Sequence, residues 1–176
     1  MRHVAIVLLA LTATAHAEDE DAYFASFPKL SVAAGMTGHG GRLDDRPESG
    51  LGAVLEVDYG RGRWQYLAEG SLGTSTVQRT MTTSEGGMRS RGALGMRWLA
   101  RQFIPFDPLG IELYLRGTAG LEHFRWASDQ ETRPDLTLGM SFATRAFRRG
   151  VFTRIDVDMV FARGDTGVAA GVVLGW

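Results

Sequence analysis

The strongest constraint on the fold of this chain is a two-residue alternation of apolar and polar side chains that recurs from residue 29 to the C-terminus. The segments 51–60 and 111–122 show it most clearly. Successive side chains of a β-strand point to opposite faces of the sheet, so each segment has one apolar and one polar face. A helix would mix the two sets on every side. The sequence therefore predicts an all-β protein.

Eight alternating segments follow one another along the chain. They span residues 29–39, 51–61, 63–77, 86–100, 109–125, 134–148, 151–162 and 166–176. Tight glycine-containing hairpins are predicted at 60–63 and 148–150. Longer polar loops are predicted at 39–50, 78–85 and 127–133. Alternating short turns and long loops are typical of an outer-membrane barrel, with the turns in the periplasm and the loops outside.

Two predicted connections fit this alternation less well. Residues 102–108 are long for a periplasmic turn, and Arg163-Gly164-Asp165 is short for an outer loop. The tripeptide also spells an integrin-binding motif, but a Gly-Asp pair between two alternating segments is equally an ordinary hairpin turn. We therefore interpret it as a turn.

The N-terminus has the organisation of a secretory signal peptide. A short basic start precedes the apolar run Val4 to Ala15, and Ala15-His16-Ala17 follows as a cleavage motif. The apolar run is shorter than the roughly 20 residues that a membrane-spanning helix needs. We expect cleavage between Ala17 and Glu18. The predicted organisation is a signal peptide at 1–17, a periplasmic segment at 18–28 and an outer-membrane β-barrel at 29–176.

Composition excludes several classes of protein. The chain of 176 residues has 19 Lys and Arg against 20 Asp and Glu, a net charge of −1, which gives no support to a nucleic-acid partner. It contains no cysteine, so it carries neither a disulfide framework nor the thiol that anchors a lipoprotein. After cleavage, His39 and His123 are the histidines that remain, which are too few for a multi-histidine metal site. We expect no cofactor and no metal.

The polar faces identify the interior of the barrel. They carry seven acids and six arginines, a nearly neutral set that we expect to pair inside a narrow barrel as an interior charge network. Its members are Glu56, Asp58, Glu69, Arg89, Arg91, Arg97, Glu112, Arg116, Glu122, Arg145, Arg154, Asp156 and Asp158. The same faces also carry small residues near the C-terminus, as a crowded interior requires.

The apolar faces carry aromatic residues at one level of the barrel. This predicted aromatic girdle at the periplasmic interface consists of Tyr59, Trp64, Tyr66, Trp98 and Trp176. The alternative is a soluble barrel with an apolar interior, for which Gly62-Arg63-Trp64 would serve as a lipocalin G-x-W motif. That motif lies on the wrong strand, so the membrane barrel is favoured.

Closure and strand number follow from the physics of the bilayer. An open sheet edge in lipid would leave backbone groups unpaired at several kcal/mol each, so the strands must form a ring. Eight strands fit the length of the chain and enclose an interior filled by side chains, not a wide aqueous channel. A general porin is disfavoured. A narrow or gated path through the charge network is retained as an alternative.

The final residues resemble the C-terminal assembly signal of bacterial outer-membrane barrels. Gly171, the apolar Leu174 and the terminal Trp176 carry this resemblance, although Ala169 stands where the family often has a polar residue. The overall pattern is similar to the small eight-stranded class, such as outer membrane protein X and the barrel of outer membrane protein A. The resemblance implies that the last strand is read by the assembly machinery and then closes the barrel against the first strand.

Candidate catalytic residues are few. His123 and Ser90 are predicted to face lipid on neighbouring strands near the outer leaflet, where lipid A-modifying barrels act, but no acid is placed to orient the imidazole. The His39-Gly40-Gly41 stretch resembles a lipase oxyanion motif without its nucleophile elbow, and we interpret it as a loop. Asp44, Asp45 and Glu48 lack calcium-loop spacing and are predicted to be solvated loop charges.

The first functional hypothesis is a non-enzymatic outer-membrane barrel that acts in envelope integrity, adhesion or surface interaction through its loops. The alternatives are a lipid A-modifying enzyme and a small gated channel. The expected partners are outer-membrane lipids, lipopolysaccharide and, during biogenesis, the assembly machinery. We expect a monomer in the outer membrane of a Gram-negative bacterium.

Overall fold

The computed structural model describes residues 29–176 with six short gaps. The gaps are residue 44, residue 62, residues 107–108, residue 128, residues 147–150 and residues 163–164. The expected signal peptide, its cleavage site between Ala17 and Glu18, and the segment 18–28 lie outside the described residues. Within the described part of the chain, no helix is long and apolar enough to cross a membrane.

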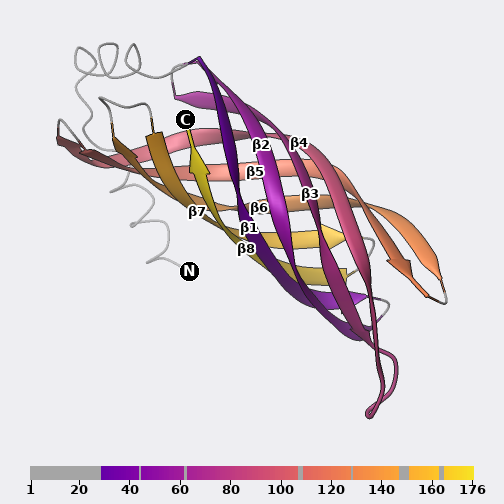
Figure 1. Cartoon of the computed structure of the whole chain (residues 1–176). Coiled ribbons are helices and arrows are strands. Elements are labelled where there is room, and N and C mark those ends of the chain that lie inside the picture. The colour runs from indigo at the N-terminus through magenta and orange to yellow at the C-terminus, as the bar shows by residue number, and fades with distance from the viewer. Residues whose placement is uncertain are drawn as a thin grey trace, which may run out of the picture.

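Eight antiparallel strands form a closed up-and-down barrel, as predicted (Figure 1). They are β1 (Leu30–Leu43), β2 (Arg46–Arg61), β3 (Trp64–Gln78), β4 (Ser84–Phe106), β5 (Leu109–Trp126), β6 (Gln130–Ala146), β7 (Val151–Ala162) and β8 (Asp165–Gly175). Each strand pairs with its neighbours in sequence, and β8 closes the ring by pairing with β1 from Ala33↔Gly175 to Gly41↔Gly167. No strand edge of the described ring is therefore left open along this register.

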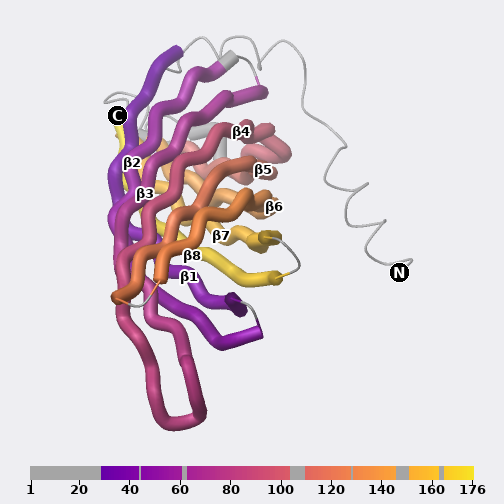
Figure 2. Tube along the Cα trace, turned by 90° about the vertical axis from the view of Figure 1, so that its right-hand side faces the viewer, coloured from indigo at the N-terminus to yellow at the C-terminus, as the bar shows by residue number. Residues whose placement is uncertain are grey.

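Lys29, the first described residue, and Trp176 lie at one end of the barrel, which we call the terminal end; the opposite end is the distal end. The backbones of Val32 and Trp176 exchange two hydrogen bonds of 3.0 Å, and the Gly60 amide donates to the Lys29 carbonyl at 2.8 Å. The hairpin of β3 and β4 projects furthest at the distal end (Figure 2).

The connections at the distal end are shorter than the sequence predicted. The predicted loop at 39–50 is wrong for most of its length, because β1 continues to Leu43 and β2 begins at Arg46. The predicted loop at 127–133 is likewise shortened by β6, which begins at Gln130. Polar residues dominate both faces of these strand ends, so the alternation that marks a strand is lost although the backbone ladder continues.

The predicted long connection at 102–108 is also mostly strand. β4 runs for 23 residues to Phe106 and stays paired with β5 down to Phe106↔Leu109. Two register shifts, between Leu99 and Arg101 and between Gln102 and Ile104, interrupt this ladder. Each shift places an extra residue on one strand and breaks the two-residue period, which is why the sequence pattern fades before the strand ends.

Burial alternates along the strands with polar residues inside and apolar residues outside. On β2, Glu56 is 1% exposed, whereas its neighbours Leu55 and Val57 are 56% and 39% exposed. This is the reverse of a water-soluble barrel, whose apolar face fills the core. The soluble-barrel alternative is therefore wrong, and the outer surface is an apolar band.

Small apolar clusters lie toward the distal and the terminal end of the polar interior. At the distal end, Leu43, Val77, Phe124 and Trp126 pack together. At the terminal end, one cluster contains Ala33, Val54, Phe152 and Val173, and another contains Leu99, Tyr114 and Ala143. The interior thus carries buried charges along its length, with small apolar clusters beside them toward both ends.

Candidate functional site

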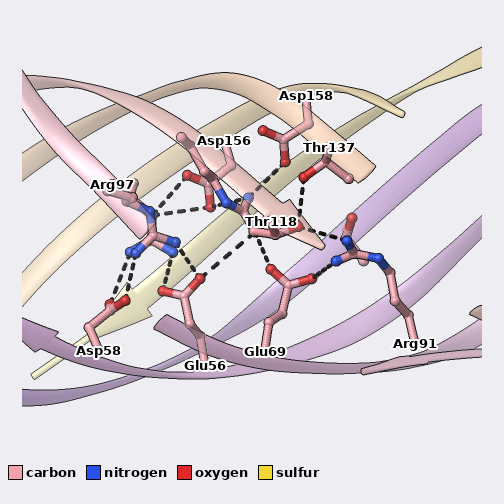
Figure 3. Close-up of polar contacts among 12 residues, drawn as sticks. Glu56, Asp58, Glu69, Arg91, Arg97, Thr118, Thr137, Asp156 and Asp158 are labelled. Carbon is pink, nitrogen blue, oxygen red and sulfur yellow. Dashed lines mark hydrogen bonds and ion pairs between the residues drawn. The ribbon is translucent and has the colours of Figure 1, made fainter. Parts of the chain in front are cut away.

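The centre of the interior is built around Arg97, which is 0% exposed (Figure 3). Its guanidinium donates to Asp58 at 2.7 Å and also contacts Glu56. Arg154 enters from β7, donating to Glu56 at 2.6 Å and to Asp156 at 2.9 Å. Charges from β2, β4 and β7 therefore converge on one buried cluster.

Arg116 and Arg91 extend this cluster toward the distal end. Arg116 contacts Glu69 and donates to Asp158 at 2.8 Å. Arg91 contacts the same Glu69 at 2.8 Å and donates to Asp135 at 2.5 Å. Glu69 thus joins the two arginines, so the central charges form one continuous network.

The remaining predicted charges pair at the two ends of the interior. At the distal end, Glu122 contacts Arg89, and Arg133 donates to it at 3.0 Å. At the terminal end, Arg145 lies 3.6 Å from Glu112, which also accepts a hydrogen bond of 2.6 Å from the Tyr114 hydroxyl. The structure therefore places all thirteen predicted interior charges inside the barrel, each in at least one ion pair.

Sequence analysis missed Arg133 and Asp135 in this network. Arg133 was assigned to a loop, but it is 6% exposed on β6. Both residues are in phase with Thr137, an inward position further along the same strand. Continuing the two-residue period of β6 from Thr137 back toward its first residues would have predicted both side chains to point inward.

The prediction that Glu48 is a solvated loop charge is wrong. Glu48 belongs to β2, and its side chain lies inside the barrel, 7% exposed, where it accepts a 2.7 Å hydrogen bond from the Ser75 hydroxyl. His39 Nε2 lies 2.7 Å from the same carboxylate. His39 itself is on β1 and not in a loop. Asp45 is exposed at a turn with φ of 64°, and residue 44 lies outside the described residues.

The buried network is held together by its own ion pairs. Removing one partner of such a pair strongly destabilises a protein, because the other charge is left uncompensated in the interior. Among the described residues, no group of three or more His, Asp or Glu side chains is arranged to hold a metal ion. The described interior is thus filled by paired charges.

The outward aromatic residues gather at the terminal end. Tyr59 pairs with Tyr66 across β2 and β3, and Trp64 pairs with Trp98 across β3 and β4. The Trp64 and Trp98 rings are 6.4 Å apart. Trp176 is 59% exposed at the end of β8. The five residues thus form a band of rings at one level of the outer surface.

Ser90 and His123 lie opposite each other on the outer face of β4 and β5. His123 Nδ1 makes a 2.8 Å hydrogen bond with the Thr132 hydroxyl. In the described part of the chain, no carboxylate is hydrogen-bonded to this imidazole. The pair therefore lacks the third group that would orient a catalytic base.

A polar cleft of about 390 Å³ lies at the distal end, beside the hairpin of β3 and β4. Hydroxyl side chains dominate its lining, which consists of Pro47, Glu48, Ser49, Thr76, Gln78, Met81, Thr82, Thr83 and Ser84. Met81 is 97% exposed at its rim. The cleft is open to solvent at the distal surface.

The tip of this hairpin is held by its own contacts. The Thr80 hydroxyl accepts hydrogen bonds from the amides of Thr82 and Thr83 at 3.3 and 3.0 Å. Arg79 donates to Glu85 at 2.8 Å, and its guanidinium lies 5.6 Å from the centre of the Trp126 ring. These contacts fix the tip to the distal apolar cluster, so the cleft is largely preformed.

Comparison with known proteins identifies the fold. No family model matches this chain, and no curated protein matches it. The structure of Neisserial surface protein A superposes with a TM-score of 0.59 at 8% identity, covering 84% of this chain and 96% of that one. Ail, the attachment invasion locus protein of Yersinia pestis, has a TM-score of 0.44 at 11% identity, covering 83% and 95%.

The N-terminal barrel domain of Pseudomonas aeruginosa OprF has a TM-score of 0.38 at 13% identity, covering 83% of this chain and 97% of that one. The likeness to the neisserial protein carries the assignment. This chain has the fold of the small eight-stranded outer-membrane β-barrels, as its sequence pattern predicted.

Proposed function

We propose that this chain is an integral outer-membrane protein that interacts with an external partner through the hairpins at its distal end. It is exported with removal of residues 1–17, is assembled by the outer-membrane machinery and stays a non-enzymatic monomer among outer-membrane lipids and lipopolysaccharide. The terminal end then faces the periplasm and the distal end, where the hairpin of β3 and β4 projects (Figure 2), faces outward, as the longer extracellular loops of such barrels do.

The observation that carries the membrane location is the reversal of the two faces. The inward side is charged and ion-paired, whereas the outward side carries an apolar band that ends in aromatic rings. Such a surface is stable against acyl chains and would aggregate in water. The aromatic rings favour the interface because their apolar bodies meet acyl chains while their polar atoms reach the headgroups.

The preformed cleft supports surface interaction as the activity. A partner that binds an ordered hairpin loses less conformational entropy than one that must order a flexible loop. Met81 is an exposed apolar side chain beside several hydroxyl groups, and an apolar anchor within a polar rim is typical of interaction sites. The adhesive role would therefore reside in the tip of β3 and β4.

Substituting Met81→Asp is expected to reduce attachment at least about tenfold, because a charge replaces the apolar anchor of the interface. A deletion strain would carry the wild type, Met81→Asp or the control Gln130→Asp, which changes an exposed residue on the hairpin of β5 and β6. Attachment to cultured epithelial cells and resistance to detergent would be measured in parallel.

The control should attach like the wild type, and all three strains should resist detergent equally. Wild-type attachment by the Met81→Asp strain would contradict the proposal. A deletion strain that loses only detergent resistance would assign the protein to envelope integrity instead.

A further inference from the structure

We propose that the outer face of β4, β5 and β6 carries a binding site for the phosphorylated lipid A headgroup of lipopolysaccharide. The site lies at the distal end of the barrel and is built around His123 and Arg125 of β5. It rests on the proposed function, because the distal end must face outward to meet that leaflet. It is separate from the cleft beside Met81, which lies at the tip of the hairpin of β3 and β4.

The polar groups of the site begin where the apolar band of β5 ends. Leu115, Ala119 and Leu121 follow one another on the outer face, and Leu121 is 59% exposed. The next two outward positions are His123 and Arg125. In a membrane barrel, polar side chains that directly follow the apolar band meet the lipid headgroups. His123 and Arg125 are therefore at the depth of the headgroups.

Hydroxyl groups flank His123 on both neighbouring strands. His123 pairs with Ser90 of β4 and with Thr132 of β6, so the three side chains form one row across the outer face. Directly paired side chains of a sheet are roughly 5 Å apart at Cβ. The Thr132 hydroxyl and His123 Nδ1 make a hydrogen bond of 2.8 Å. When the hydroxyl donates this bond, the ring proton lies on Nε2, which can donate it to a ligand oxygen.

Arg125 supplies the positive charge of the site. It is exposed and pairs with Gln130 of β6. On the described outer faces of β4, β5 and β6 there is no acidic side chain, because Glu122 and Glu131 occupy inward positions. The Asp129 carboxylate lies in the turn and accepts a 2.7 Å hydrogen bond from the Gln130 amide. A phosphate group accepts hydrogen bonds from guanidinium, imidazole and hydroxyl donors, so this set of side chains fits a phosphate.

An open area of the outer surface beside the polar row favours a lipid over a free anion. Gly92 is the next outward residue of β4 after Ser90, and it pairs with Gly70 of β3. Beyond the chain neighbours, no atom lies within 4 Å of a Cβ built on either glycine. Leu121 pairs with Gly92, and Leu72 is the next outward residue after Gly70. The two glycines thus leave a depression between leucines, where an acyl chain can pack next to the phosphate donors.

The rest of the distal rim does not repeat this combination. On the described outer faces of β2, β3, β7 and β8, no cationic side chain lies at the distal end. The outward arginine of β1, Arg42, donates to the Asp45 carbonyl at 3.2 Å. The site is therefore confined to one sector of the barrel, and a ligand held there would have one fixed position.

The test measures binding of lipid A to the full chain folded in detergent micelles, by native mass spectrometry. The probes are bisphosphorylated lipid A and the same lipid after removal of both phosphates. The wild type should bind the phosphorylated lipid at least about tenfold more tightly, because charged hydrogen bonds form only with it. Arg125→Gln should remove most of this difference. His123→Leu should reduce it, and His123→Gln, which keeps a donor, should restore part of it.

Gly92→Leu should weaken the binding of both lipids, because the new side chain fills the depression. Its matched control is Gly86→Leu, at another open outward position of β4. The matched control for Arg125→Gln is Arg101→Gln, which changes an exposed arginine at the terminal end. Both controls should bind like the wild type. Millimolar inorganic phosphate should not displace the lipid, because it has no acyl chain to occupy the depression.

Equal affinity for the two lipids, displacement by inorganic phosphate, or equal losses in Arg125→Gln and Arg101→Gln would overturn the proposal. The assay uses purified protein and does not measure attachment. A negative result would therefore leave the role of Met81 in attachment untouched, and normal attachment by Met81→Asp would leave the lipid site untouched.

Discussion

Replacing Arg116 with alanine is expected to lower the free energy of unfolding by about 3–5 kcal/mol, the range found when one partner of a buried ion pair is removed. Arg116 is 7% exposed. Its guanidinium contacts Glu69, lies 2.8 Å from Asp158 and lies 3.5 Å from Asp156. Without it, three carboxylates lose a common counter-ion in an interior that water reaches poorly.

The measurement is urea unfolding of barrels refolded in lipid vesicles, followed by tryptophan fluorescence. Arg125→Ala is the matched control, because Arg125 is an exposed arginine on the same strand. Surface substitutions usually change stability by less than about 0.5 kcal/mol, so the control should unfold with the wild type. Equal midpoints for Arg116→Ala and Arg125→Ala would contradict the role of the network in stability.

Deleting Trp176 is expected to reduce the folded barrel in the outer membrane far more than it lowers the stability of barrels refolded in vitro. In the folded state Trp176 contributes two backbone hydrogen bonds to Val32 and an exposed ring at the rim. Those contacts are modest and lie at the end of a strand. If the assembly machinery also recognises the final residues, the deletion mainly reduces the number of chains that fold into a barrel in the cell.

The effect of the deletion on assembly in cells can be separated from its effect on the stability of the refolded barrel. Folded small barrels migrate differently in gels before and after boiling, so heat-modifiable protein measures the folded yield in cells. Urea unfolding of the same variants measures stability after refolding. Trp176→Phe keeps an aromatic terminus and should restore most of the cellular yield. Equal cellular yields with and without Trp176 would mean that the residue is only part of the girdle.

The sequence predicted the fold where one face of a strand is apolar. The segment from Leu51 to Tyr59 alternates cleanly, and β2 places its odd-numbered residues outward as predicted. The prediction failed where both faces are polar, as at His39–Leu43 and 130–133, because period-two alternation needs contrast between the faces. The β-bulges of β4 after Leu99 removed the period in another way.

The same contrast explains which interior residues were found. Arg97 and Asp158 alternate with apolar neighbours, so their inward direction could be predicted from the sequence. Glu48 lies between a proline and a serine, and its burial depends on Ser75 of the next strand and His39 of the previous one. The cleft beside Met81 depends on how the strands are offset, which a single sequence does not encode locally.

The central claim is that the charged face lies inside and the apolar face meets lipid, and the tryptophans test it directly. The chain has four tryptophans. Trp176 is 59% exposed on the outer surface, whereas Trp126 is 7% exposed and stacks on Phe124 with ring centres 5.2 Å apart. Two variants that each keep one of these tryptophans, with phenylalanine at the other three positions, would be refolded into vesicles with and without brominated lipids.

Bromine on an acyl chain quenches a tryptophan only at short range. The account predicts strong quenching of the variant that keeps Trp176 and little change in the variant that keeps Trp126. Quenching of Trp126 as strong as that of Trp176 would place the interior side chains against lipid and contradict the assignment of the two faces.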